Sequence, residues 1–405
     1  MIKAAHGISE ELIEWRRDFH MHPEIGFDVQ RTAGIVAAAL EGMGYRVRSG
    51  VGKTGVVAEL GSGNRVVAIR ADMDALPILE RNETEYASTL PGRMHACGHD
   101  AHTAMALGAA MLLSRQQLEG TVRFLFQPSE EAADDEGLSG AQRMAMEGAM
   151  DGVHFVIAQH VDPEMPAGRI GISPGATFGG VDSWYGVIMG VGGHGAHPDK
   201  TIDPFFLTAH VITALNGIVS RRLDPLKPAA VSIGSLHGGE TENVIPESVR
   251  ITGTLRFMEA TVRELLHTEI RRAFDIATAL GGGYQLRFET GGPPMENHPQ
   301  VSKVIAQTAA ELIGSGNVGP TPLSLGAEDF GSFLERAPGA MFTLGTQREG
   351  RPVFGLHHPE FDIDESALPI GTALLAETAL RLLRADADGA SASRASLAPL
   401  PGQAS

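Results

Sequence analysis

Apolar and polar residues follow two different patterns along the first half of the chain, one typical of helices and the other of buried strands. Stretches that are rich in Ala, Leu and Met, or amphipathic at helical spacing, predict helices at residues 9–21, 32–43 and 101–117. Short runs of β-branched and aromatic residues predict strands at residues 56–59, 65–70 and 121–126. Because strands and helices alternate, we expect an α/β core with a mostly parallel sheet buried between helices.

A turn between two of these runs predicts a β-hairpin. Residues 61–64 (GSGN) separate the run at 56–59 from the run at 65–70. Glycine and asparagine tolerate the backbone angles of tight turns, and β-branched residues flank them on both sides. We therefore expect these two strands to pair with each other antiparallel.

Residues 182–292 follow a pattern of their own. Their apolar runs predict strands at residues 183–191, 229–236, 249–257 and 284–289, and helices at residues 203–221 and 259–280. The resulting order, β-α-β-β-α-β, is typical of a ferredoxin-like unit. Residues 291–294 (GGPP) look like a return linker, so we interpret 182–292 as a domain inserted between two halves of another.

The remaining residues complete the larger domain. Helices are predicted at 299–314 and 366–384, and a strand at 340–345. The fold class is therefore α/β with two domains: a three-layer domain around a mostly parallel mixed sheet, formed by 1–181 and 293–384, and the inserted ferredoxin-like α+β domain. The tail 385–405 is rich in Ala, Ser and Pro and is predicted to be disordered.

Composition and charge narrow the classes of function. The chain has 405 residues, which suits two domains, and its formal net charge of −17 would repel phosphate backbones and anionic membranes. We expect neither a nucleic-acid nor a membrane partner. Its single cysteine, Cys97, cannot form an internal disulfide, and we see no apolar run of the length that spans a bilayer. These features favour a cytoplasmic protein.

The first candidate site is the segment 94–102 (MHACGHDAH), which precedes a predicted buried helix. Cys97 and His99 flank a glycine, so both side chains can converge on one point. Thiolate and imidazole are good ligands for zinc and similar metals. The alternative is that Cys97 is a small buried hydrophobe.

Other candidates lie where strands end. Glu130 and Glu131 follow the strand at 121–126, where α/β proteins place active sites, although an acidic loop exposed to solvent is the alternative. His160 ends another apolar run, and His357 and His358 lie in a loop before the last helix. A single histidine is usually structural. Together, these groups form the ligand inventory of a two-metal hydrolytic site.

Several motifs, in order along nearly the whole chain, resemble one metallopeptidase family, which contains aminoacylase, carboxypeptidase G and hippurate hydrolase. The chain is most similar to the branch that hydrolyses hippurate and auxin conjugates. The matching stretches are residues 20–27 (HMHPEIGF), 70–77 (RADMDALP), 94–102, 127–131 (QPSEE), 193–194 (GH), 243–246 (NVIP), 253–256 (GTLR), 326–330 (GAEDF) and 357–359 (HHP).

The resemblance implies two divalent metal ions bridged by Cys97, zinc or manganese in the first place, while cobalt and nickel also suit the ligands. His99 and His160 would complete one site, and Glu131 and His357 the other, with His358 as the alternative to His357. Glu130 would be the general base acting on a metal-bridging water. Asp72 and Asp74 would orient the ligands.

The inserted domain is implied to serve both dimerisation and substrate binding. His194 would reach the active site of the partner subunit, and Asn243 and Arg256 would hold the substrate's carboxylate. The resemblance therefore implies a homodimer or homotetramer joined through the inserted domain.

The implied activity is hydrolysis of N-acyl-L-amino acids, such as hippurate-like or N-acetyl compounds. A dipeptidase or carboxypeptidase with the same site is the alternative enzyme, and a non-catalytic amino-acid-binding protein is the alternative outside enzymes. Phe178, Leu325 and Phe354 are predicted pocket walls, and the acidic loop at 132–140 is a candidate determinant of substrate choice.

Overall fold

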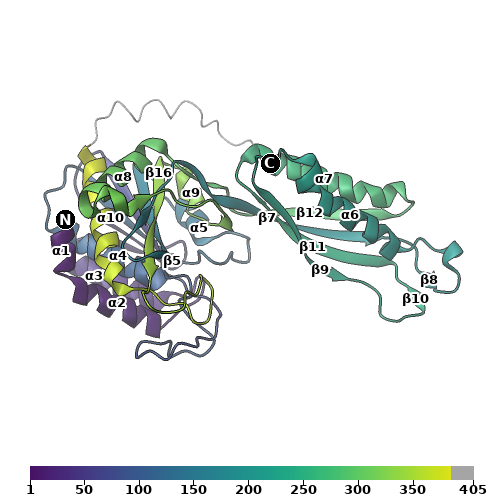
Figure 1. Cartoon of the computed structure of the whole chain (residues 1–405), viewed down its shortest axis with the longest axis horizontal. Coiled ribbons are helices and arrows are strands. Elements are labelled where there is room, and N and C mark those ends of the chain that lie inside the picture. The colour runs from purple at the N-terminus through teal and green to yellow at the C-terminus, as the bar shows by residue number, and fades with distance from the viewer. Residues whose placement is uncertain (385–405) are drawn as a thin grey trace.

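The computed structural model describes residues 1–384, so the predicted disordered tail lies outside the described residues. Figure 1 shows a rounded part, at left, and an elongated part, at right. The rounded part contains an eight-stranded sheet and the elongated part an antiparallel sheet. This arrangement confirms the predicted α/β class.

The larger sheet has the strand order β1-β2-β4-β3-β5-β16-β6-β14. Its central strands β4, β3, β5 and β16 run parallel. β1 pairs antiparallel with β2, β2 with β4 and β6 with β16, while the edge strand β14 pairs parallel with β6. The bounds are β1 Arg46–Val51, β2 Gly55–Gly61, β3 Val66–Asp72, β4 Thr121–Gln127, β5 Phe155–Pro166, β6 Ile170–Gly171, β14 Val318–Gly319 and β16 Gly339–Gln347.

Helices cover both faces of this sheet, as the predicted three layers require. Successive strand residues point to opposite faces, so Phe124 and Phe126 enter one apolar core while Leu125 enters another. The first core receives α1 Ile2–His6, α2 Ser9–Met21, α3 Gln30–Gly42, α4 His99–Ser114, α8 Pro299–Ile313 and α10 Leu368–Arg384. The second receives α5 Gly140–Met146 and α9 Gly331–Leu334.

The predicted hairpin between residues 56–59 and 65–70 is wrong. β2 pairs antiparallel with β1 and with β4, and β3 pairs parallel with β4 and β5, so β4 separates the two expected partners. The connecting loop passes the start of β4: a Cβ added to Gly61 would lie 2.2 Å from the Gly120 carbonyl oxygen. The turn residues are compatible with a tight hairpin between β2 and β3. The apolar strand β4 lies between them instead, and this arrangement buries both β2 and β3.

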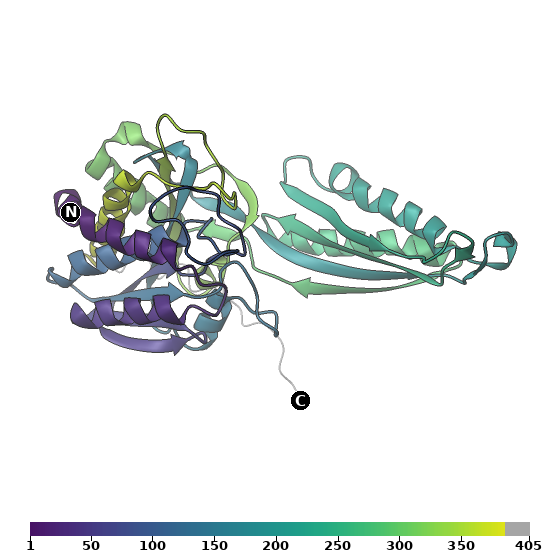
Figure 2. The same ribbon diagram turned by 90° about the horizontal axis from the view of Figure 1, so that it is seen from below.

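The elongated part has the predicted ferredoxin-like topology. Its strands follow the order β12-β7-β11-β9, all antiparallel, and α6 and α7 lie together along one face (Figure 2). Trp184 is fully buried between this sheet and the helices. The bounds are β7 Gly175–Met189, β8 Gly193–His194, α6 Pro204–Arg222, β9 Ala229–His237, β10 Val244–Ile245, β11 Ser248–Phe257, α7 Ala260–Ala279 and β12 Gly283–Thr290.

Strand β7 runs through both parts. Near its start it pairs with β13 Met295–Asn297 and β15 Ser324–Ala327, and further along it pairs with β11 and β12. The domain boundaries at 182 and 292 stay predictions.

Asp182 joins the two chain segments that cross between the parts. Its carboxylate is fully buried and accepts hydrogen bonds from Arg263 (2.6 and 2.8 Å), His267 (2.7 Å) and the backbone N–H of Gly291 (3.0 Å). Because Gly291 lies on the returning segment, this one side chain connects both crossings.

Among residues 1–384, the helical segment Glu365–Arg384 has the length and mean hydropathy (1.2) of a membrane span. However, 78% of its apolar window is buried inside the protein, where α10 packs against α4 and α8. A core helix accounts for its apolar character.

We expect Arg263→Met to destabilise the elongated part, because it leaves the buried Asp182 carboxylate without its cation. The expected loss in free energy of unfolding is about 3 kcal/mol. Urea unfolding in a Trp15→Phe background, where Trp184 is the remaining tryptophan, would measure it. Arg287→Met removes an exposed ion pair with Glu289 in the same sheet and should barely move the transition. Equal shifts in both variants would contradict the role of Asp182.

Candidate metal centre

The turn before α4 places Cys97 and His99 side by side. Gly98, between them, has a left-handed backbone (φ 85°), and a Cβ added there would lie 2.3 Å from a methyl group of Val161. His99 Nδ1 lies 2.8 Å from the Asp74 carbonyl oxygen and therefore donates to it. Its Nε2 is buried, has no hydrogen-bond partner among the described residues, and is left free as a ligand atom.

His160 completes the first group of donors. It lies within β5, which continues beyond the predicted strand end to Pro166. His160 Nδ1 donates to the Val161 carbonyl oxygen (2.8 Å), and its Nε2 is 3.6 Å from Cys97 Sγ. The ligand atoms of Cys97, His99 and His160 all lie within 4.8 Å of one another.

A second group shares Cys97 and adds Glu131 and His357, again with all ligand atoms within 4.8 Å. Glu131 Oε1 lies 3.1 Å from His357 Nε2, yet this oxygen forms no hydrogen bond among the described residues. His357 has a left-handed backbone (φ 64°), and its N–H donates to the Ala96 carbonyl oxygen (2.8 Å). Such strain in a non-glycine residue is typical of functional sites.

The structure brings His357 to the cluster and directs its neighbour elsewhere. The ring of His358 stacks on Phe354 with centroids 4.5 Å apart, and its Nδ1 accepts a hydrogen bond from the N–H of Glu360 (3.1 Å). Phe354, a predicted pocket wall, therefore packs against this histidine.

Asp72 and Asp74 lie behind the cluster. The two oxygens of Asp74 accept the backbone N–H groups of Glu130 (3.0 Å) and Glu131 (3.1 Å), which fixes the loop that carries both glutamates. Asp72 Oδ1 is 2.6 Å from His102 Nδ1, and its Oδ2 is 3.6 Å from His99 Nε2. Asp74 therefore contacts the backbone of Glu131, and Asp72 lies beside His99; their role in orienting ligands stays a prediction.

The electrostatics of the cluster suit bound cations. Burial raises the pKa of the Cys97 thiol well above its usual value, and burial together with the carboxylates of Glu328 and Asp329 raises the pKa of Glu130. A divalent cation would reverse the penalty on the thiolate. With unpartnered His99 Nε2 and Glu131 Oε1 directed into a set of sulfur, nitrogen and oxygen donors, the residues fit two divalent metal ions.

Four charged or polar residues beside the cluster received no role from the sequence: Arg70, Gln127, Glu328 and Asp329. Glu328 and Asp329 have carboxylate oxygens within 4.8 Å of a Glu130 oxygen. The signal for Arg70 was present, since it is a cation inside the apolar run 65–70 and is almost fully buried. A buried arginine requires carboxylate partners, which Asp72 at the end of β3 and the two residues after β15 supply.

The predicted substrate residues lie apart from the cluster. His194 is exposed on β8, opposite Val244 of β10, and the Asn243 carbonyl oxygen accepts the N–H of Gly195 (2.9 Å). Burial lowers the pKa of Arg256 on β11, and no ion pair among the described residues involves it. The structure brings none of these three into the metal-binding groups of residues 1–384.

The two other predicted pocket walls lie near where β7 enters the elongated part. Phe178 is on β7, opposite Ser324 of β15, and Leu325 is the next residue on β15. Loop 132–140 follows Glu131 directly in the chain. It is anchored by ion pairs of Asp134 with Lys53 and Arg143 (both 2.6 Å).

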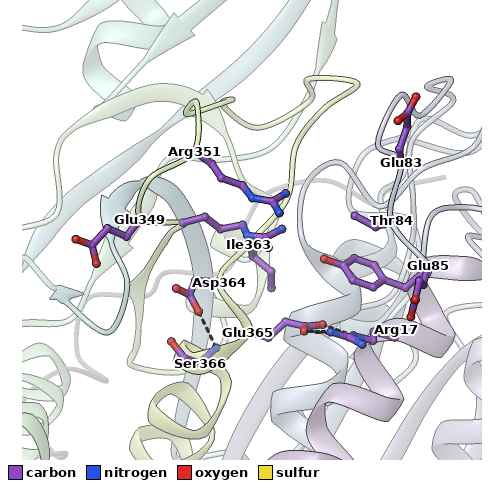
Figure 3. Close-up of a pocket in the computed structure, with 12 residues that line it drawn as sticks. Arg17, Glu83, Thr84, Glu85, Glu349, Arg351, Ile363, Asp364, Glu365 and Ser366 are labelled. Carbon is purple, nitrogen blue, oxygen red and sulfur yellow. Dashed lines mark hydrogen bonds and ion pairs between the residues drawn. The ribbon is translucent and has the colours of Figure 1, made fainter.

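A separate cavity of about 560 Å³ opens between loop residues 83–86 and 348–351. Figure 3 shows Glu83, Arg351 and the ion pair between Arg17 and Glu365 at this cavity. None of its lining residues belongs to the metal-binding groups.

Comparison with known proteins points to one family. A profile of peptidase family M20/M25/M40 matches residues 68–381. Thermostable carboxypeptidase 1 of Saccharolobus solfataricus is 37% identical over 380 residues (91% of this chain, 95% of that protein). An N-acyl-L-amino acid amidohydrolase of Geobacillus stearothermophilus is 43% identical over 298 residues (72% and 80%). A dinuclear metal-binding peptidase of the M20 family from Bacillus subtilis superimposes with a TM-score of 0.81 at 33% identity (94% and 99%). These matches agree with the resemblance that the motifs carry.

We expect His357→Ala to lose one of the two bound metal ions, because it removes a donor from the group that contains Glu131. His358→Ala is the matched control and should keep both, since its ring faces Phe354. Metal content of purified, dialysed protein, measured by mass spectrometry, distinguishes the two variants. The reverse pattern would show that His358 is the ligand.

Proposed function

Because the chain belongs to peptidase family M20/M25/M40, a family of metal-dependent amidohydrolases and peptidases, we propose that it hydrolyses N-acyl-L-amino acids to a carboxylic acid and a free amino acid. The observation that carries this proposal is the pair of donor groups that share Cys97 and have Glu130 beside them. The similarity to a named N-acyl-L-amino acid amidohydrolase supports the substrate class.

Cys97, His99 and His160 would hold one ion, and Cys97, Glu131 and His357 the other. We propose zinc or manganese as the native ions, and the ligand set also suits cobalt or nickel. When bound, the ions would supply Lewis acidity to the scissile carbonyl and to the attacking water. A site that needs a reduced Cys97 favours a reducing compartment, so we place the enzyme in the cytoplasm.

Glu130 is the proposed general base. Its backbone is held by Asp74, and its side chain is close to His99 without being part of either three-residue group that shares Cys97. Its carboxylate takes a proton from the attacking water and delivers it to the leaving nitrogen of the amide.

His194, Asn243 and Arg256 are proposed to bind substrate across a subunit interface. They lie on the elongated part, and so do exposed apolar side chains that a dimer would cover: Val191, Phe206, Leu236 and Val244. In this arrangement His194 of the partner subunit stabilises the tetrahedral oxyanion. Arg256, half-buried and without a carboxylate partner, binds the substrate's carboxylate through its planar fork.

A carboxypeptidase or dipeptidase that uses the same residues is the second candidate. The similarity to a thermostable carboxypeptidase over 91% of this chain favours it. The two activities differ in the acyl group that the site accepts, so one substrate panel tests both.

We expect metal-stripped protein to hydrolyse N-acetyl, N-benzoyl and dipeptide substrates only after zinc, manganese or cobalt is restored. Glu130→Gln should lower kcat by about 10²–10⁴-fold while keeping both metals, since it removes a proton acceptor and not a ligand. Amino-acid release and metal content are the measurements. No hydrolysis of any substrate by metal-loaded protein would favour the ligand-binding alternative.

We expect inactive Glu130→Gln and His194→Ala proteins to regain activity when they are unfolded, mixed in equal amounts and refolded. A mixed dimer has one site with its own Glu130 and the partner's His194, so about a quarter of the wild-type activity should return for a two-fold symmetric dimer. Each variant refolded alone is the control. A mixture as inactive as its components would place His194 in its own subunit's site or outside catalysis.

A further inference from the structure

Arg70 is almost fully buried at the carboxyl end of β3, at the edge of the sheet where the metal-binding cluster lies. Its guanidinium meets four side chains: Nη1 is 2.8 Å from Asp72 Oδ2, Nε donates to Gln127 Oε1 (2.8 Å), and Nη2 is 3.0 Å from both Glu328 and Asp329. Burial alone would lower the pKa of Arg70, but the carboxylates of Asp72, Glu328 and Asp329 outweigh it and raise that pKa.

One side of Arg70 faces the metal-binding histidines through Asp72. With Oδ2 of Asp72 held by Arg70, the other oxygen is directed at His102, whose Nε2 accepts the N–H of Val161. Asp72 Oδ2 also lies 3.6 Å from the free Nε2 of His99. A change at Arg70 therefore reaches a ligand through one intervening side chain.

The other side of Arg70 faces the two carboxylates that follow β15. Glu328 and Asp329 follow directly after β15, which pairs in parallel with β7 at Phe178 and Gly179. Asp329 is held by Gln127 Nε2 (2.7 and 2.8 Å) and by the N–H of Ala141 (3.0 Å), so it is fixed to the loop that carries Glu130. Arg70 thus contacts the ends of β3 and β4 and the two residues that follow β15, the strand that pairs with β7.

We propose that Arg70 is a positioning residue that couples the inserted part of the chain to the metal centre, by holding Asp72 and the Glu328–Asp329 pair in one fixed arrangement. A displacement of β7 moves β15, and β15 carries Glu328 and Asp329 with it. Because these carboxylates share a guanidinium with Asp72, the displacement is transmitted to the group that faces His99.

Only arginine can fill this role at the site. Its planar fork carries N–H groups in several directions at once, and here it forms ion pairs with Asp72 on one side and with Glu328 and Asp329 on the other. Lysine would keep the charge but present a single ammonium group. One ammonium cannot hold Asp72 and the Glu328–Asp329 pair in a fixed arrangement at the same time. The conservative variant therefore separates positioning from charge.

Cobalt binding tests this inference, which rests on the proposed two-metal site. Arg70→Lys should weaken Co²⁺ binding by about 10-fold or more and shift the visible absorption of the bound ion. The matched control is Arg123→Lys on β4, which pairs with Glu59 away from the cluster and should lower thermal stability alone. If Arg70→Lys does not fold, Glu328→Gln with Asp329→Asn, which preserves side-chain size, replaces it and should show the same two changes.

A double-mutant cycle tests the coupling itself. A methyl group on Gly179 would lie 3.2 Å from Leu325, so Gly179→Ala disturbs the contact between β7 and β15. It should shift the cobalt absorption when Arg70 is present and leave it unchanged in the Arg70→Lys protein. Independent effects of the two changes, or wild-type cobalt binding by Arg70→Lys, would overturn the inference. Failure of the wild-type protein to bind Co²⁺ would instead overturn the proposed function.

Discussion

The metal-binding cluster depends on the left-handed turn at Gly98. A helix that began one residue earlier would carry Cys97 and His99 away from each other, whereas this turn directs both at one point. Val161 closes the space that a side chain at position 98 would need, and the same stretch of β5 carries His160. Glu131 and His357 lie near the same sulfur as His99 and His160. The position of Cys97 therefore decides whether the two donor groups share a ligand.

Local sequence was most informative where chemistry and strand ends coincide. The candidate donors lie beside predicted helices and strands or, for His357, in a loop, and the choice of ligands among them is implied by the family resemblance. The structure brings together Cys97, His99, Glu131, His160 and His357. Parallel strands place their carboxyl ends at one edge, so this convergence follows from the α/β pattern. The metal-binding roles themselves stay predictions.

The remaining features depend on pairing between distant segments. The hairpin prediction was wrong because β4, more than fifty residues further along, occupies the place between β2 and β3. The sequence left the choice between His357 and His358 open, since it is decided by the backbone contact of His357 with Ala96 and by the ring of Phe354. Glu328 and Asp329 gained significance only through Arg70, which is 258 and 259 positions away.

The interrupted course of the larger sheet also sets an order for its assembly on the ribosome. The segment that forms the elongated part is continuous, so its own contacts are complete once β12 has emerged, and domains generally fold as units. The larger sheet is incomplete until β16, which lies in its interior beside β5, has been synthesised. His357 comes after β16 in the chain. A nascent chain can therefore carry a folded insert while the donor group of Cys97, Glu131 and His357 is still incomplete, so the second proposed metal site is completed only at the end of synthesis or later.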